Sequence, residues 1–141
     1  MTKEEIMAIS PGRELDALVA EKVMGLETYR SLEEWKLKGM PHIENWSNAV
    51  SYPAYYHPIY ELATVVPYYS TNVYEAWEVV EKMKAPFGVF KHINGGFIIN
   101  WCYMFYSCSG CDNDCKEDAE IEAPTAPEAI CKAAILISLV L

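Results

Sequence analysis

The chain has 141 residues, of which 52% are hydrophobic and 22% are charged. This length and composition predict one folded domain with a single hydrophobic core. The formal net charge of −9, with lysines scattered among glutamates, argues against long nucleic acids and anionic membranes as partners, because proteins bind these through clustered Lys and Arg. A small anion stays compatible with this charge, because helix N-termini and a few local cations can bind one.

The two ends of the sequence are typical of a cytoplasmic protein. Residues 1–10 contain no apolar signal core. The apolar run at residues 133–141 is shorter than the roughly 20 residues that a membrane-spanning helix needs. A cytoplasmic location without a membrane partner is therefore expected.

Two helices are expected near the start of the chain. Thr2 and Glu5 have the spacing of a capping box, which indicates that a helix begins there. A second helix is expected over residues 13–25, where apolar residues follow one stripe and Gly25 stands where a C-cap glycine belongs. The simplest interpretation of this segment is an amphipathic helix that packs on a core.

Two further helices are expected in the second half of the chain. One covers residues 72–84, is capped by Ser70 or Thr71, and directs an apolar stripe that includes Trp77 toward the core. The other begins after Thr125 as its N-cap and is almost wholly apolar in its second half. It is therefore expected to lie buried between a sheet and another layer.

Residues 27–66 lack a clean periodicity. They contain seven aromatic residues, and their prolines at positions 41, 53 and 58 argue against a continuous helix. We expect a long, partly ordered insertion with a short helix at about residues 31–39. A connection of this length is usually functional or mobile, and its aromatic side chains are expected to pack on another surface, such as a second subunit.

The strongest hairpin signal lies in residues 87–106, where two β-rich runs flank an Asn-Gly-Gly turn at residues 94–96. A pairing that closes on this turn places Phe90 opposite Asn100. The second run is apolar on both of its faces, so both faces need cover. The expected fold class is therefore α+β, with a small antiparallel β-sheet covered by helices on both faces as an α/β/α sandwich in a single domain.

A cysteine-rich loop is expected at about residues 107–117. Its residues Cys108, Cys111 and Cys115 partly match a metal knuckle, but zinc sites usually need two well-spaced pairs of ligands. A variable loop with reduced thiols is the simpler interpretation. We therefore expect no metal and no cofactor.

The three histidines, His42, His57 and His92, share no metal-binding or triad spacing. His92 stands beside the expected turn and could reach a ligand near Phe90, although an exposed hairpin histidine is the simpler interpretation. The sequence contains no phosphate-binding loop and no nucleophile elbow. The residues thus favour a binding or structural protein over an enzyme.

Three separated segments carry motifs that together resemble those of a known family. They are GRELDALVAEKVMG at residues 12–25, PYYSTNVYEAWEVVEKM at residues 67–83 and TAPEAICKAAIL at residues 125–136. Their order, with a hairpin between the second and the third, resembles the phage ABA-sandwich domain family. More narrowly, the chain resembles the Thoeris anti-defence 1 group of phage proteins.

This resemblance implies a function in the cytoplasm of an infected bacterial host. Proteins of the group sequester cyclic ADP-ribose isomers such as glycocyclic ADP-ribose, which bacterial TIR-domain enzymes make, and do not cleave them. The resemblance also implies a homo-oligomer, with hexameric assembly, and binding of cyclic oligonucleotides from CBASS defence. The implied partner is therefore a small cyclic nucleotide signal.

The resemblance further implies where the ligand binds. The family uses an aromatic residue and an asparagine from the hairpin region, and Phe90 and Asn100 are the candidates here because stacking and amide hydrogen bonds suit a nucleobase. Ligand phosphates are expected at helix starts and at cations. The expected phosphate contacts are Arg13, Ser70, Thr71, Thr125 and Lys132. Lys132 departs from the family pattern of arginines in the closing helix, and lysine binds phosphate as a point charge rather than as a fork.

Two alternatives stay open. The first is an enzyme that hydrolyses the same nucleotide signal, although the sequence lacks a histidine pair or an activated nucleophile. The second is a structural or interaction protein without a small ligand, which uses the aromatic insertion to block another protein. Recovery of unchanged ligand from denatured protein separates the first alternative from sequestration.

Overall fold

The computed structural model describes residues 1–45, 50–83, 87–91, 97–101 and 121–139, and within residues 87–91 and 97–101 it describes the backbone. The helices are α1 (Lys3–Ala8), α2 (Arg13–Lys22), α3 (Leu32–Leu37), α4 (Val73–Met83) and α5 (Ala126–Ser138), with a 3-10 turn η1 at Ile43–Asn45. The strands are β1 (Thr28–Tyr29), β2 (Ala54–His57), β3 (Leu62–Val65), β4 (Phe87–Lys91), β5 (Phe97–Trp101) and β6 (Ile121–Ala123).

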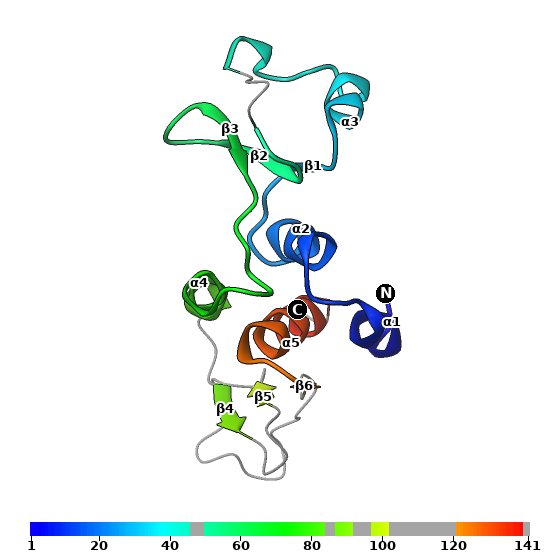
Figure 1. The fold of residues 1–141 in the computed structure, drawn as a ribbon, viewed down its shortest axis with the longest axis vertical. Coiled ribbons are helices and arrows are strands. Elements are labelled where there is room, and N and C mark those ends of the chain that lie inside the picture. Colours follow the sequence, from blue (N-terminus) through cyan, green and yellow to red (C-terminus); the bar gives the residue numbers. More distant parts are fainter. Residues whose placement is uncertain (46–49, 84–86, 92–96, 102–120, 140–141) are drawn as a thin grey trace.

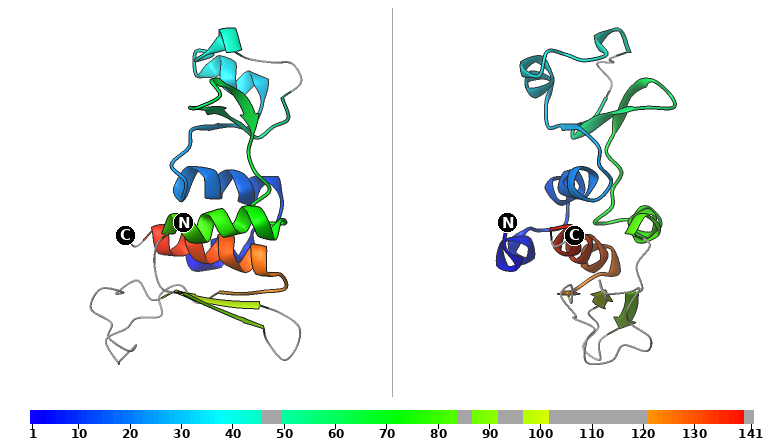
Figure 2. Two further views of the ribbon diagram at one scale, coloured as in Figure 1. Left: turned by 90° about the vertical axis from the view of Figure 1, so that its left-hand side faces the viewer. Right: turned by 180° about the vertical axis from the view of Figure 1, so that it is seen from behind.

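A helical layer packs on a small antiparallel sheet of order β4-β5-β6 (Figure 1). Helix α5 is the centre of this layer and contacts β5 and β6 as well as α1, α2 and α4. The prediction of an α+β fold in a single domain is thereby confirmed. The described helices lie on one face of the β4-β5-β6 sheet (Figure 2).

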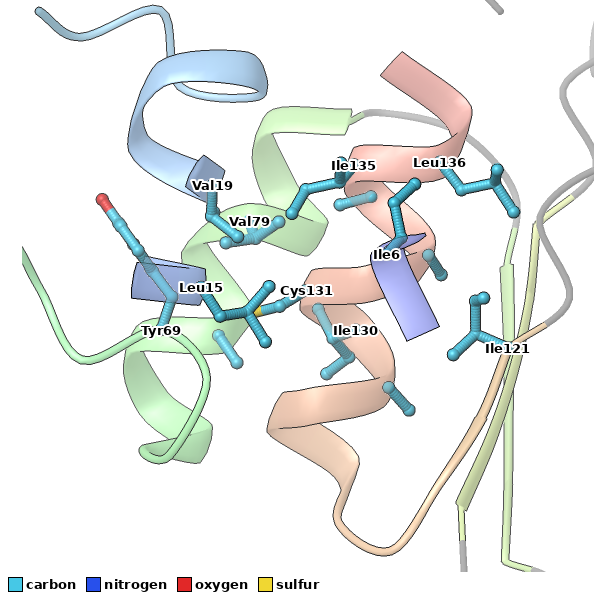
Figure 3. Close-up of a cluster of buried hydrophobic side chains, with 14 of the residues drawn as sticks. Ile6, Leu15, Val19, Tyr69, Val79, Ile121, Ile130, Cys131, Ile135 and Leu136 are labelled. Atoms are coloured by element: carbon cyan, nitrogen blue, oxygen red, sulfur yellow. The ribbon is translucent and has the colours of Figure 1, made fainter. Parts of the chain in front are cut away.

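The hydrophobic core surrounds α5, whose residues 127–137 are all buried. Apolar side chains from α1, α2, α4 and β6 converge on it (Figure 3). They include Ile6 of α1, Leu15 and Val19 of α2, Val79 of α4 and Ile121 of β6. Burial of each large aliphatic side chain contributes about 1.5–3 kcal/mol, so this cluster is the main source of stability. The prediction that the last helix lies deeply buried between a sheet and another layer is confirmed.

Local capping signals fix two of the helix starts as the sequence indicates. At α1, the Thr2 hydroxyl accepts from the Glu5 N–H at 3.2 Å, while the Glu5 carboxylate accepts from the Thr2 N–H at 2.6 Å. At α5, the Thr125 hydroxyl accepts from the Glu128 N–H at 3.4 Å. Helix α2 differs at its end: it stops at Lys22 with Val23 as its C-cap, so Gly25, at a φ of 70°, lies beyond the cap that we expected it to form.

The start of α4 differs from the prediction. The cap is Asn72, whose Oδ1 accepts from the N–H groups of Tyr74 at 2.9 Å and Glu75 at 3.3 Å. Ser70 is buried and has partners in α2 instead, as described below. The expectation that Trp77 belongs to the core is also wrong, because its exposed fraction is 47%. The helix begins one residue later than expected, and Val79 rather than Trp77 lies in the core.

The register of the β4–β5 hairpin also differs from the prediction. Phe90 pairs with Ile98, and Asn100 pairs with Gly88, so Phe90 and Asn100 are not direct cross-strand partners. The described part of this ladder reaches Lys91 and Phe97. The observed pairing is therefore shifted by two residues from the expected register.

The insertion at residues 27–66 contains a second antiparallel sheet of order β1-β2-β3. A small core supports it, formed by Tyr29, Trp35, Ala54 and Ala63. The rings of Tyr29 and Trp35 stack at 4.3 Å, and the Trp35 indole donates to the Pro41 carbonyl at 2.9 Å. The expected short helix is present as α3. The strands were not expected, because runs of two to four residues are too short to show a β period.

Polar contacts attach the insertion to α2. The Arg30 guanidinium donates to the Glu21 carboxylate, to the buried Thr28 hydroxyl at 2.8 Å and to Glu14 at 3.1 Å. Burial by itself raises the pKa of Glu21, but hydrogen bonds from Arg30 and Thr28 outweigh it and hold that pKa below its ordinary value. Glu21 is therefore a charged anchor between α2 and β1.

Candidate functional site

Helices α2, α4 and α5 run side by side and begin at the same end of the molecule (Figure 2). The β4-β5-β6 sheet reaches this end with its cross-strand row Lys91, Phe97 and Ala123, and Ala123 precedes the Thr125 cap by two residues. We call this region, which contains the starts of the three helices and that row, the helix-start end. Each helix start carries a partial positive charge equivalent to about half an elementary charge, so the arrangement favours an anion there.

A buried polar joint connects the starts of α2 and α4. Asp16, with no exposed surface, accepts from the Ser70 N–H at 2.7 Å and from the Arg13 guanidinium at 2.6 Å. The Ser70 hydroxyl accepts from the Gly12 N–H at 2.8 Å. Gly12 has a φ of 146°, which side chains disfavour, so a glycine suits this position. The joint fixes the relative positions of two of the three helix starts.

Arg13 is held by several partners at the edge of this joint. Besides Asp16, its guanidinium donates to the main-chain carbonyls of Val66 at 2.5 Å and Pro67 at 3.4 Å. It also lies over the Tyr68 ring, 4.0 Å from the centroid. The side chain of Arg13 keeps an exposed fraction of 29%, so part of this cation faces solvent at the helix-start end.

Tyr68 presents an aromatic surface beside Arg13. Its main chain is anchored at both ends: the N–H donates to the Glu75 carboxylate, and the carbonyl accepts from Thr71 at 3.3 Å and Asn72 at 2.9 Å. The residue nevertheless has an exposed fraction of 46%. A ring with a fixed backbone and a cation on one face is suited to contact a planar ligand, because little order is lost on binding.

The other residues expected to bind phosphate have different surroundings. Thr125 and the exposed Thr71 both lie at the helix-start end, and the Thr125 hydroxyl is occupied as the α5 cap. Lys132 lies within α5, is 3% exposed, and donates to the Glu128 carboxylate at 2.7 Å and to the Met7 carbonyl at 2.9 Å. The structure thus brings Arg13, Ser70, Thr71 and Thr125 to one end and separates Lys132 from solvent.

The expected hairpin contacts are only partly described. The backbone places Phe90 next to the Lys91 end of the ladder, whereas Asn100 lies three positions along β5 from Phe97. Phe90 is therefore nearer to the helix-start end than Asn100 is. His92 and the cysteines Cys108, Cys111 and Cys115 lie outside the described residues.

Sequence reasoning missed Asp16 and Asn72. The spacing of Asp16 from Arg13 is that of a helical i, i+3 ion pair, which is a signal that could have identified this contact. Asn72 is a preferred N-cap residue one position after the expected cap. The exposure of Tyr68 has no sequence signal, because the neighbouring Tyr69 is buried.

Two buried ionisable groups near the joint, Cys131 and Tyr69, keep their neutral forms. Burial raises the pKa of the Cys131 thiol, and the nearby carboxylates of Asp16 and Glu128 raise it further. Burial likewise raises the pKa of Tyr69, with Glu78 adding to the shift. An un-ionised thiol with no exposed surface is a poor nucleophile, so Cys131 acts as a small core residue.

Within the described ranges, no group of three or more metal-ligating side chains is close enough to hold a metal ion. Among the same residues, no helix combines the length and apolar character that crossing a membrane requires.

The model of the phage ABA sandwich domain matches residues 17–135. The chain belongs to this family. A similar solved structure is the 2.0 Å crystal structure of a phage protein from Bacillus cereus ATCC 14579, with a TM-score of 0.57 and 23% identity over 92% of each chain. That likeness shows a shared fold. No protein with a curated description matches the chain.

Proposed function

We propose that this phage ABA sandwich protein is an anti-defence sponge that binds and sequesters a cyclic nucleotide signal without degrading it. The proposed ligands are cyclic ADP-ribose isomers such as glycocyclic ADP-ribose, made by TIR-domain proteins, with CBASS cyclic oligonucleotides as further candidates. The proposed setting is the cytoplasm of an infected bacterial host, and the proposed active form is a homo-oligomer, with a hexamer as the specific expectation.

The observation that carries this proposal is the shared start of α2, α4 and α5 beside Arg13 and Tyr68. Cyclic nucleotides of this class combine phosphates with a flat base. Helix starts and an arginine suit the phosphates, and an exposed aromatic ring suits the base. Membership of a phage domain family and a phage protein as structural neighbour support the viral context.

The helix-start end also contains negative charge that limits this attraction. Glu14 and Asp16 lie in the first turn of α2, and Glu75 lies in the first turn of α4. The Asp16 charge is balanced by Arg13, and the Glu75 carboxylate is engaged by the Tyr68 N–H. Because the whole chain is acidic, binding must depend on local groups and is expected to weaken as salt is raised.

Calorimetric titration of the full chain with glycocyclic ADP-ribose tests the proposal. We expect tight binding, and after heating and chromatography we expect the ligand to be recovered unchanged. A recovered hydrolysis product would instead support the enzyme alternative. Absence of heat with this ligand and with cyclic oligonucleotides at micromolar protein would overturn the sponge and leave an interaction protein as the surviving interpretation.

Variants at the expected ligand contacts locate the site. Phe90→Ala and Tyr68→Ala each remove a ring that could stack on a base, and each contact is worth about 1–3 kcal/mol, or roughly 5- to 150-fold in Kd. Asn100→Ala removes an amide that can donate to and accept from a base edge. Leu37→Ala is the control, because Leu37 is 87% exposed on the insertion and should leave Kd unchanged.

A further inference from the structure

The turn between β2 and β3 depends on one imidazole nitrogen. His57 Nδ1 accepts from the backbone N–H of Ile59 at 3.1 Å and from the backbone N–H of Tyr60 at 3.2 Å. Only an unprotonated nitrogen can accept these bonds, so the observed turn requires a neutral imidazole with its proton on Nε2. We propose that protonation of His57 opens this turn, which makes the β2–β3 tip a pH-sensitive device independent of the proposed ligand site.

Protonation would replace two attractive contacts with repulsive ones. A proton on Nδ1 would point at two N–H donors that have lost their acceptor. His57 is half-buried, so solvent protons reach it.

The groups around His57 offer no compensating negative charge. The ring centroid of His57 lies 5.8 Å from that of Tyr55 in β2 and 4.4 Å from that of Tyr60 in the turn. Burial and Glu78 raise the pKa of Tyr55, so it is a neutral phenol near pH 6. Glu61 follows in the turn and is exposed, but no carboxylate forms an ion pair with His57 in the described part of the chain.

The remaining bonds at the tip do not replace the lost acceptor. The Glu61 N–H donates to the His57 carbonyl at 2.8 Å, which closes the turn through the main chain. Glu61 has a φ of 54°, a conformation that costs a non-glycine residue about 1 kcal/mol or more, so the turn needs its other bonds. Opening would change how the apolar side chains at the tip, Ile59 and Tyr60, are presented; their exposed fractions are 80% and 70%.

The test is NMR on the full chain between pH 8 and pH 5. The His57 ring signals report protonation, and the amide signals of Ile59 and Tyr60 report the turn. We expect both amides to shift in step with the ring titration, and we expect their exchange, corrected for pH, to accelerate on the order of tenfold as two hydrogen bonds are lost. Ring titration with both amides unchanged would overturn the proposal.

His57→Asn is the matched variant. The asparagine Oδ1 can accept from the same two N–H groups and does not titrate, so its Ile59 and Tyr60 amides should stay constant over this range. His42→Asn is the second control, because His42 stacks on Tyr56 at 3.7 Å and accepts no bond from the turn. The inference fails if the amide changes persist in His57→Asn or disappear in His42→Asn.

Discussion

The backbone N–H of Ser70 donates to the carboxylate of Asp16 at 2.7 Å across 54 positions of sequence. Asp16 has no exposed surface, and its second oxygen accepts from Arg13. One buried carboxylate therefore aligns the starts of α2 and α4 and restrains Arg13 beside the exposed Tyr68 ring.

Asp16→Ala is expected to lower the free energy of unfolding by about 3 kcal/mol, because it leaves the Ser70 N–H and the Arg13 guanidinium without their carboxylate. Urea denaturation followed by circular dichroism measures this change. Glu81→Ala is the control: Glu81 is exposed on α4, and its loss should change stability by less than about 0.5 kcal/mol. Equal denaturation midpoints for Asp16→Ala and wild type would show that the joint contributes nothing to the free energy of unfolding.

Lys132→Met is expected to destabilise the fold by about 3–5 kcal/mol, because it leaves the buried Glu128 carboxylate without its cation. The double variant Lys132→Met with Glu128→Leu should recover most of this loss, since an apolar pair needs no charge compensation. Denaturant midpoints of the two variants supply the comparison. If Lys132 instead serves a ligand, the single variant would keep its stability and lose affinity.

The Glu21 anchor should make stability depend on pH. Because Arg30 and Thr28 hold the pKa of Glu21 below the ordinary 4.5, its contribution is complete above about pH 5 and is lost as the pH falls through the lowered value. The difference in unfolding free energy between wild type and Glu21→Gln should therefore be largest at neutral pH and shrink toward pH 3. A difference that stays constant over this range would contradict a charged anchor.

The two candidate caps of α4 can be separated by paired substitutions. Asn72→Ala should cost about 1 kcal/mol, because two N–H groups of the first turn lose their acceptor. Thr71→Ala should cost less than about 0.5 kcal/mol, since this exposed residue is not the cap. Thermal unfolding of both variants decides between them. The reverse order of stabilities would restore Thr71 as the cap.

Several elements were predictable because neighbours in sequence determine them. The capping box at Thr2 and the cap at Thr125 act over three residues, and the apolar run after Thr125 can only be buried. The α+β class followed from these helices and the β-rich runs. The strands of the insertion were not predictable, because they are too short to show an alternation of apolar and polar residues. They also depend on the Trp35 core for support.

The candidate site was predictable only in part. Arg13, Ser70, Thr71 and Thr125 were expected to serve the ligand, and the structure places them at one end of the helices. The expected direct pairing of Phe90 with Asn100 is wrong, because a strand that is apolar on both faces does not specify its register by alternation. Side-chain exposure along α4 also differed at Trp77, where a helical stripe alone does not specify which edge meets the core.

The sequence by itself determined where most helices begin, which helix is central, and the family to which its motifs point. Those features arise from contacts within about four residues and from the apolar content of each segment. Only the tertiary structure decided which charged side chains are paired with groups elsewhere in the chain. Arg13 finds carbonyl partners more than 50 positions away, and Lys132 reaches a carbonyl 125 positions away. A buried charge must find such partners wherever the fold brings them, because leaving it unpaired costs several kcal/mol, on the order of the net stability of a small domain.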